Sequence, residues 1–225
     1  AVDDLDLLPT ITRPVKILCV GKNYRSHAEE IGSEVPDHPM IFVRFPASVV
    51  GHGQPLVAPR ASERYDFEGE LGVVIGRPGR HIAQSNALAH VAGYVPFMDG
   101  SVRDFQRHTS QFTAGKNFDQ SGSMGPCLVT ADEIGDPAAV PIETRLNGEI
   151  VQSGAASDMM FDIPALIAYC STFTTLEPGD VIATGTPPGV GAARTPPLWL
   201  KAGDTLEVDL GPVGCLANPI VDEPG

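Results

Sequence analysis

The chain has 225 residues, of which 42% are hydrophobic, so it is long enough to form one large domain with a well-developed core. Its formal net charge is −13, from 28 acidic and 15 basic residues, which argues against the basic surface that a nucleic-acid partner requires. An anionic substrate would therefore need positive charge supplied by the binding site itself. No apolar run approaches the length of a membrane span.

The cysteines and the N-terminus indicate a cellular compartment. Four cysteines are scattered along the chain without a C-x-x-C pair. Cys19, Cys127 and Cys170 lie in apolar contexts, so we expect buried free thiols in a reducing compartment. The N-terminus is acidic and does not have the pattern of a signal peptide. We therefore expect a cytoplasmic protein that binds neither nucleic acid nor a membrane.

The first part of the chain is expected to form short strands and loops. Apolar runs over 15–20 and 40–45 predict two strands, the first of them buried. Between them, residues 21–30 have a helical or turn-like composition, and the Gly and Pro content of residues 32–39 predicts a loop. The Gly and Pro spacing across 47–59 is typical of hairpins.

Residues 66–76 join a group of carboxylates to an apolar strand. Alternate side chains of an extended chain share a face, so we expect Glu68 and Glu70 to point the same way. Two carboxylates at the start of a buried strand repel each other. A hard divalent cation such as Mg²⁺, Mn²⁺ or Ca²⁺ is the simplest way to compensate their negative charge. Asp99 ends another predicted strand, over 95–100, and is a third possible ligand. A solvated acidic strand end and a turn-forming aspartate are the alternatives.

The second half of the chain combines strands with short helices. Ser101 and Asp104 have the spacing of an N-cap and its partner, so a short helix is expected from residue 101. Asn147-Gly148, between two alternating arms, is the strongest hairpin signal. The remaining predicted elements are helices over 82–91 and 158–172 and strands over 181–183, 205–210 and 216–221. Strands predominate and no internal repeat or linker occurs, so we expect one α+β domain over residues 1–225.

Other residues suggest substrate binding and proton transfer. His27 and Glu30 are three residues apart, so on a helix the carboxylate could orient the imidazole and raise its basicity. Lys116 lies among small and polar residues, where it could hold an anionic substrate, and its surroundings lack the spacing of a P-loop. The glycine-rich loop over 184–191 could bind a carboxylate through backbone N–H groups and hydroxyls. A surface His–Glu pair, a surface lysine and a structural loop are the alternatives.

Several short motifs, taken in order, resemble the fumarylacetoacetate hydrolase superfamily, specifically its short single-domain members similar to acylpyruvases. The motifs are Gly21-Lys22-Asn23-Tyr24 followed by His27 and Glu30, then the segments 65–71, 99–106, 115–119, 124–126, 176–180 and 184–187, and finally Gly189-Val190-Gly191. Each motif is weak alone, but the ordered set covers nearly the whole chain. The chain departs from the family at Met98 and Gly100, where Asn and Val are common. We expect Gly100 to loosen the turn after Asp99 and Met98 to reshape the pocket.

The resemblance implies a mixed β-sheet rolled into a barrel-like α+β fold with a few short helices, usually in a homodimer. Residues 1–14 would be an N-terminal lead, and residues 22–39 a lid that orders over bound substrate. The implied site residues are the Mg²⁺ or Mn²⁺ ligands Glu68, Glu70 and Asp99, the catalytic residues His27, Glu30 and Lys116, and the substrate-binding residues Arg103, Gln106, Lys116 and Thr186.

The leading functional hypothesis is a metal-dependent hydrolase that cleaves a C–C bond in an acylpyruvate-like 2,4-dioxo acid. The metal would stabilise the enolate, and His27 with Glu30 would activate water. The same enolate chemistry serves decarboxylases, isomerases or tautomerases, and hydratases of related 2-oxo acids such as oxaloacetate, and these are the alternative. A non-catalytic binding protein is a further class, which the presence of all three carboxylates, the lysine and the His–Glu pair opposes.

Overall fold

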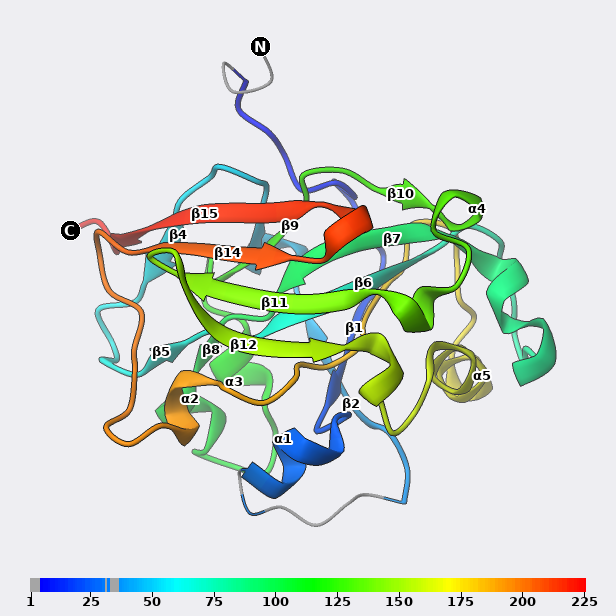
Figure 1. Ribbon diagram of the computed structural model, residues 1–225, viewed down its shortest axis with the longest axis horizontal. Helices are drawn as coiled ribbons and strands as arrows, with labels where there is room; N and C mark the ends of the chain where they lie inside the picture. The colour runs from blue at the N-terminus through cyan, green and yellow to red at the C-terminus, as the bar shows by residue number, and fades with distance from the viewer. Residues whose placement is uncertain (1–4, 31, 33–36) are drawn as a thin grey trace.

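Two β-sheets curl around the main hydrophobic core as a half-barrel, and short helices lie around their margins (Figure 1). The computed structural model describes residues 5–30, 32 and 37–225. The mixed sheets confirm the expected α+β roll.

The larger sheet has the strand order β2-β1-β13-β6-β7-β9-β3, with β10 paired to β7. Its strands are β1 (Ile17–Gly21), β2 (Met40–Arg44), β3 (Val49–Val50), β6 (Gly69–Ile75), β7 (Val91–Met98), β9 (Gly122–Met124), β10 (Val129–Thr130) and β13 (Val181–Ala183). The smaller sheet has the order β12-β11-β14-β15-β4. Its strands are β4 (Leu56–Ala58), β11 (Pro141–Leu146), β12 (Glu149–Ala155), β14 (Thr205–Asp209) and β15 (Cys215–Asp222). A separate pair joins β5 (Tyr65–Asp66) to β8 (Ser101–Val102).

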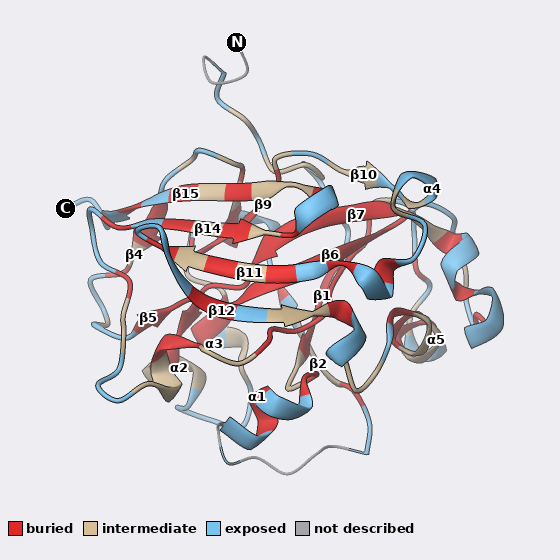
Figure 2. Ribbon diagram, in the orientation of Figure 1, coloured by how far each residue is buried: buried red, intermediate tan, exposed pale blue. Residues whose placement is uncertain are grey.

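The two faces of the larger sheet pack against different groups of residues. One face meets the smaller sheet, and its apolar residues, including Leu71 and Val73 of β6, form one cluster with Val208 of β14. The opposite face carries a second cluster around Val74 and Phe97. Because both faces are covered, β6 and β7 are buried along nearly their whole length (Figure 2). This double burial explains the continuous apolar run of the acidic strand.

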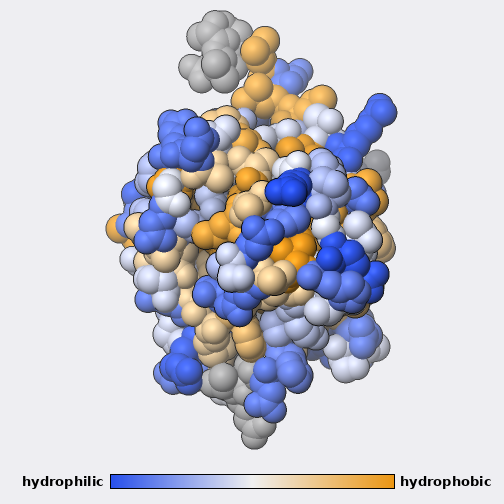
Figure 3. Space-filling view, turned by 90° about the vertical axis from the view of Figure 1, so that its right-hand side faces the viewer, coloured by the Kyte–Doolittle hydropathy of each residue, from blue (hydrophilic) through white to orange (hydrophobic). Residues whose placement is uncertain are grey.

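The helices are short. The α-helices of the described residues are α1 (Arg25–Glu30), α2 (Arg103–Gln106), α3 (Thr113–Lys116), α4 (Ala131–Ile134) and α5 (Ile163–Phe173). The 3₁₀ helices there are η2 (Pro46–Ser48), η3 (Gln84–His90), η4 (Pro137–Ala139), η5 (Ala156–Asp158), η6 (Gly191–Ala193) and η7 (Gly211–Val213). Figure 3 shows apolar surface in the middle of the face that carries α5 and η3, whose large exposed apolar residues are Leu88 and Phe173.

Most of the expected strands are present, and the Asn147-Gly148 hairpin is confirmed. Asn147 and Gly148 have φ angles of 53° and 82°, the left-handed values that a tight two-residue turn requires. The hairpin expected over 47–59 is wrong, because β3 and β4 belong to different sheets and each pairs in parallel with a distant strand.

Three helix expectations are corrected. Ser101 is not an N-cap, because it lies in β8 and its hydroxyl donates to the carbonyl of Asp99. The helix expected from residue 158 begins at Ile163, because the Asp162 side chain caps it by accepting from Ala165 N. The helix expected over 82–91 is the 3₁₀ helix η3.

The expected lead and lid stay predictions, and the expectation for the thiols is confirmed in part. Residues 1–4, 31 and 33–36 lie outside the described residues. They include parts of the expected lead, of the expected lid and of the expected loop over 32–39. Ile11, in the described part of the lead, packs against the second apolar cluster. The cysteines are free, but Cys127 is exposed rather than buried. Within the described ranges, no helix is both long enough and apolar enough to cross a bilayer.

Candidate metal centre and active site

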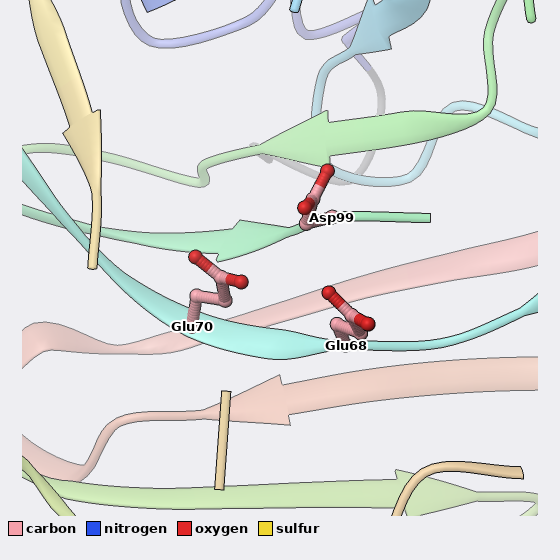
Figure 4. Close-up of side chains that lie close together, drawn as sticks. All are labelled: Glu68, Glu70 and Asp99. Atoms are coloured by element: carbon pink, nitrogen blue, oxygen red, sulfur yellow. The ribbon is translucent and has the colours of Figure 1, made fainter. Parts of the chain in front are cut away.

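The pairing of β6 with β7 brings three carboxylates together. Gly69 lies opposite Met98, and the N–H of Asp99 donates to the carbonyl of Glu68 at 2.9 Å. Glu68 and Glu70 project from the same side of β6 toward Asp99 (Figure 4), as the alternation predicted. One oxygen from each carboxylate lies within 4.8 Å of the others, and all three residues are buried. The alternative of a solvated strand end is therefore wrong.

Two buried cations bind part of this cluster. Lys116 Nζ lies 2.7 Å from Glu68 Oε2 and 2.6 Å from Asp99 Oδ2, and Arg103 Nη1 lies 2.7 Å from Glu68 Oε1. Burial raises the pKa of Glu68, but Lys116 and Arg103 outweigh it and hold that pKa below its usual range. Lys116 is 1% exposed and packs on the ring of Phe42, so the surface-lysine alternative is also wrong.

Glu70 carries the charge that the cluster leaves uncompensated. Its Oε2 accepts a hydrogen bond from Gly185 N at 2.9 Å, and no basic side chain of the described residues forms an ion pair with it. Burial, Asp99 and Glu68 together raise the pKa of Glu70 well above its usual value. Such a concentration of hard oxygen donors and excess negative charge fits a divalent cation held by Glu68, Glu70 and Asp99.

Two glycines allow the backbone around the cluster to pack closely. A Cβ on Gly69 would overlap Thr144 Oγ1 of the smaller sheet, so this strand needs glycine to lie against its neighbour, as the sequence suggested. A Cβ on Gly100 would overlap the carbonyl of Ser121. Gly100 therefore tightens the turn after Asp99, and the expectation of a loosened turn is wrong. Met98 belongs to the apolar cluster that faces the smaller sheet, away from the carboxylates, and does not reshape the pocket.

The predicted His–Glu pair lies on α1 and is connected to the glycine-rich loop. His27 Nδ1 is 3.2 Å from Glu30 Oε2; His27 is buried, whereas Glu30 is exposed, so the surface alternative is wrong for the imidazole only. Gly189 N donates to both carboxylate oxygens of Glu30 at 3.0 and 3.1 Å. The loop does bind carboxylates, as predicted, but they are the chain's own: Gly189 holds Glu30 and Gly185 holds Glu70.

A cavity of about 670 Å³ lies between α1, α2 and η6, and its lining includes Lys22, His27, Glu30, Arg103 and Arg107. Arg103 connects this cavity to the carboxylate cluster, because the same guanidinium binds Glu68. The cavity lining therefore supplies the positive charge that an anionic ligand needs in an acidic protein.

Arg103 is held in place by Asp66, to which the sequence assigned no role, and by Gln106, whose predicted substrate contact stays a prediction. Its Nε donates to Asp66 Oδ2 at 2.7 Å, and Asp66 also accepts from the N–H groups of Gly191 and Ala192 in η6. Arg103 Nη1 donates to Gln106 Oε1 at 2.9 Å. Arg103 Nη2 is buried and has no hydrogen-bond partner among the described residues, so this donor remains for a ligand.

Thr186 follows β13 and contacts the backbone of β6 next to the carboxylates. Its hydroxyl donates to Gly69 O at 2.9 Å and accepts from Gln152 Nε2 at 2.8 Å. Gln152 Oε1 in turn accepts from Gly69 N and Thr144 Oγ1. These hydrogen bonds hold the backbone of β6 at Gly69. The predicted substrate contact of Thr186 stays a prediction.

The fold and the buried carboxylates define a class of enzymes with a mixed-sheet half-barrel and an acidic metal centre. The family model of the fumarylacetoacetate hydrolase C-terminal domain matches residues 16–221, and the chain belongs to this family. Oxaloacetate tautomerase YisK of Bacillus subtilis is 46% identical over 224 residues, which are 98% of this chain and 74% of that protein.

Solved structures agree with this membership. A fumarylacetoacetate hydrolase from Exiguobacterium antarcticum has a TM-score of 0.88 and 40% identity, covering 96% of this chain and 78% of that chain. Fumarylpyruvate hydrolase from Pseudomonas aeruginosa, in complex with Mn²⁺ and pyruvate, has a TM-score of 0.86 and 30% identity, covering 94% and 91%. The family includes tautomerases and hydrolases, and the tautomerase relative favours the alternative functional hypothesis over C–C hydrolysis.

Proposed function

We propose that this protein is a divalent-metal-dependent tautomerase that interconverts the keto and enol forms of a small dicarboxylic 2-oxo acid such as oxaloacetate. The observation that carries the proposal is the buried cluster of Glu68, Glu70 and Asp99, joined through Arg103 to a cavity with a cationic lining. The 46% identity to an oxaloacetate tautomerase supports the choice of reaction and substrate.

The cavity supports a substrate with two negative charges. Lys22, Arg103 and Arg107 line it, although the whole chain has a net charge of −13. The unpartnered Nη2 of Arg103 is a buried donor, and leaving it without an acceptor would be costly. A dicarboxylate would satisfy this donor and would still offer a second carboxylate to the other cations that line the cavity.

The metal would bind to Glu68, Glu70 and Asp99, whose oxygens suit Mg²⁺ or Mn²⁺. Once bound, such a cation supplies Lewis-acid stabilisation of the negative charge that develops on the keto oxygen of the substrate. Lys116, between Glu68 and Asp99, adds a fixed positive charge beside the carboxylate cluster, which would also stabilise the negative charge on the keto oxygen.

His27 is the residue that we assign to proton transfer. An ionised Glu30 accepts from Nδ1–H, which leaves Nε2 as the nitrogen that can accept a proton. In the forward direction, Nε2 would take a proton from the carbon next to the keto group, and one proton would then be delivered to the keto oxygen. The number of protons on the substrate is unchanged, as tautomerisation requires. Helix α1 would keep bulk water from the reacting carbon.

A second candidate is hydrolysis of a C–C bond in an acylpyruvate, the reaction that the sequence first suggested. The similarity to fumarylpyruvate hydrolase favours it, because the chain covers 91% of that structure. His27 would then take a proton from water, and the products would be a carboxylic acid and pyruvate. The cavity of about 670 Å³ has room for a substrate and a water molecule.

A substrate panel followed by NMR separates the two candidates. The protein, supplied with Mg²⁺ or Mn²⁺, would be incubated with oxaloacetate, acetylpyruvate and fumarylpyruvate, with buffer and metal alone as the control. We expect faster exchange between the keto and enol signals of oxaloacetate than in the control, without cleavage. Accumulation of acetate and pyruvate from acetylpyruvate, with no effect on oxaloacetate, would replace the proposal by the hydrolase.

Two further properties remain proposals. We propose a homodimer, which light scattering on the purified protein would test through the molecular mass. We also propose a cytoplasmic location, which localisation of a tagged full-length protein would test.

A further inference from the structure

Arg44, at the end of β2, has a completely buried side chain that contacts Asp99 of the candidate metal centre. Each of its N–H donors has an acceptor. Nη1 donates to Asp99 Oδ1 at 2.7 Å and to Gly100 O at 2.8 Å. Nε donates to Ser48 Oγ at 3.2 Å, and Nη2 donates to Ser48 O at 3.2 Å and to Ser121 Oγ at 2.8 Å. The guanidinium is therefore fixed in position and in orientation.

The surrounding backbone leaves just enough space for this side chain. A Cβ on Gly122 would lie 2.6 Å from Arg44 Nη2, so a larger residue on β9 would displace the guanidinium. Gly100 allows the chain after Asp99 to approach Ser121, and the carbonyl of Gly100 is itself an acceptor for Arg44. Several separate segments thus build one binding site for a planar five-donor group.

This contact divides the two oxygens of Asp99 between different partners. Oδ1 accepts from Arg44, while Oδ2 faces Lys116 at 2.6 Å on the side of the carboxylate cluster. A carboxylate held in this way has a fixed orientation, and Oδ2, which it shares with the Lys116 ammonium that also binds Glu68, is the oxygen directed at the cluster. We propose that Arg44 is a positioning residue, which fixes Asp99 as a one-oxygen ligand of the divalent metal ion. The inference rests on the metal site of the proposed function, but not on the identity of the substrate.

Two effects of Arg44 on metal affinity have opposite signs. Its positive charge lies close to the site and repels a cation, whereas its hydrogen bonds hold Asp99 in the ligating orientation. Asp99 is 0% exposed, so without Arg44 its carboxylate has Lys116 as its remaining charged partner and would turn toward it. We therefore expect the loss of orientation to outweigh the loss of repulsion.

The test is Mn²⁺ binding to the full chain, measured by the loss of the free Mn²⁺ EPR signal and by calorimetry. Arg44→Met should weaken binding by about 10–100-fold, as is typical when a residue that orients a metal ligand is lost. Arg44→Lys should recover much of this loss, because an ammonium group can still pair with Asp99 Oδ1. The control is Lys16→Met. It removes a cation that lies 2.8 Å from Asp180, a buried carboxylate that is not one of the proposed metal ligands. It should leave the Kd for Mn²⁺ unchanged.

A gentler pair of variants covers the case in which Arg44→Met does not fold. Ser121→Ala removes one acceptor of Nη2 and should weaken Mn²⁺ binding, while Ser123→Ala should not. Ser123 lies two residues further on and is equally buried, but its hydroxyl has no partner among the described residues.

The possible outcomes separate this inference from the metal site itself. A wild-type protein that binds no Mn²⁺ overturns the metal site. Wild-type binding with an unchanged or tighter Kd in a folded Arg44→Met variant overturns the positioning role alone. Equal Kd values for Ser121→Ala and Ser123→Ala overturn it as well.

Discussion

Replacing Glu70 by glutamine is expected to stabilise the metal-free protein and to abolish its metal binding. Glu70 is 1% exposed, and burial, Asp99 and Glu68 raise its pKa, so its charge costs free energy when no metal is bound. Glutamine has nearly the same shape, and its Oε1 can still accept the hydrogen bond from Gly185 N. The substitution therefore removes the charge without removing the packing.

The expected gain follows from the geometry of the cluster. The ligand oxygens lie within 4.8 Å of one another, and one like-charge pair at that distance costs about 3 kcal/mol at an effective dielectric constant of about 20. Lys116 attracts the same charge and offsets part of this cost. We expect a net gain of about 1–2 kcal/mol, which would raise Tm by roughly 2–8 °C for a protein of this size.

The gain should depend on pH in a defined direction. Because folding raises the pKa of Glu70, the folded chain binds this proton more tightly than the unfolded chain. In acid, the group is protonated in both states and the substitution should have little effect. As the pH rises through the usual carboxyl range toward the raised pKa, the wild type loses stability and the variant does not.

Calorimetric unfolding in EDTA, from acidic to neutral pH, measures the gain, and a Mn²⁺ titration measures the binding. Glu149→Gln, which changes an exposed glutamate on β12, is the matched control and should alter neither quantity. A Glu70→Gln variant that is less stable than the wild type without metal would contradict the electrostatic reasoning. A wild-type Kd for Mn²⁺ would remove Glu70 from the ligand set.

Three further substitutions test other parts of the account. His27→Ala should retain Mn²⁺ binding and slow tautomerisation by about 10²–10⁴-fold, the usual share of general acid–base catalysis, and an unchanged rate would exclude His27 from proton transfer. Arg107→Ala should raise KM for a dicarboxylic 2-oxo acid more than for a monocarboxylic one, whereas the exposed Arg13→Ala should change neither; equal effects would argue against a distal carboxylate contact. Gly69→Ala should lower stability by about 1–3 kcal/mol in thermal unfolding, because its Cβ overlaps Thr144 Oγ1, and an unchanged Tm would refute that packing role.

The parts of the site that depend on local periodicity could be predicted from the sequence. Glu68 and Glu70 share a face because strand side chains alternate, and the structure retains that alternation. His27 and Glu30 meet because three residues separate them on a helix. The Asn147-Gly148 turn was predictable because its φ angles depend on two adjacent residues.

The supporting residues could not be predicted, because their partners are distant in the sequence. Arg44 lies 55 residues before Asp99, and nothing in the apolar strand that carries it indicates a buried ion pair. Asp66 binds η6 across 125 residues, so its role depends on the complete fold. The Ser101 cap failed for a related reason, since pairing with β5 places this residue in a strand.

The carboxylate cluster is expected to bind a divalent metal ion on which tautomerisation depends. The most direct test is the rate at which the enol of oxaloacetate converts to the ketone, followed by ultraviolet absorbance before and after metal removal. We expect the wild-type protein to lose its acceleration in EDTA and to regain it with Mg²⁺ or Mn²⁺, whereas Glu70→Gln should show none in any buffer. Full acceleration in the metal-depleted protein would mean that tautomerisation does not depend on a metal ion.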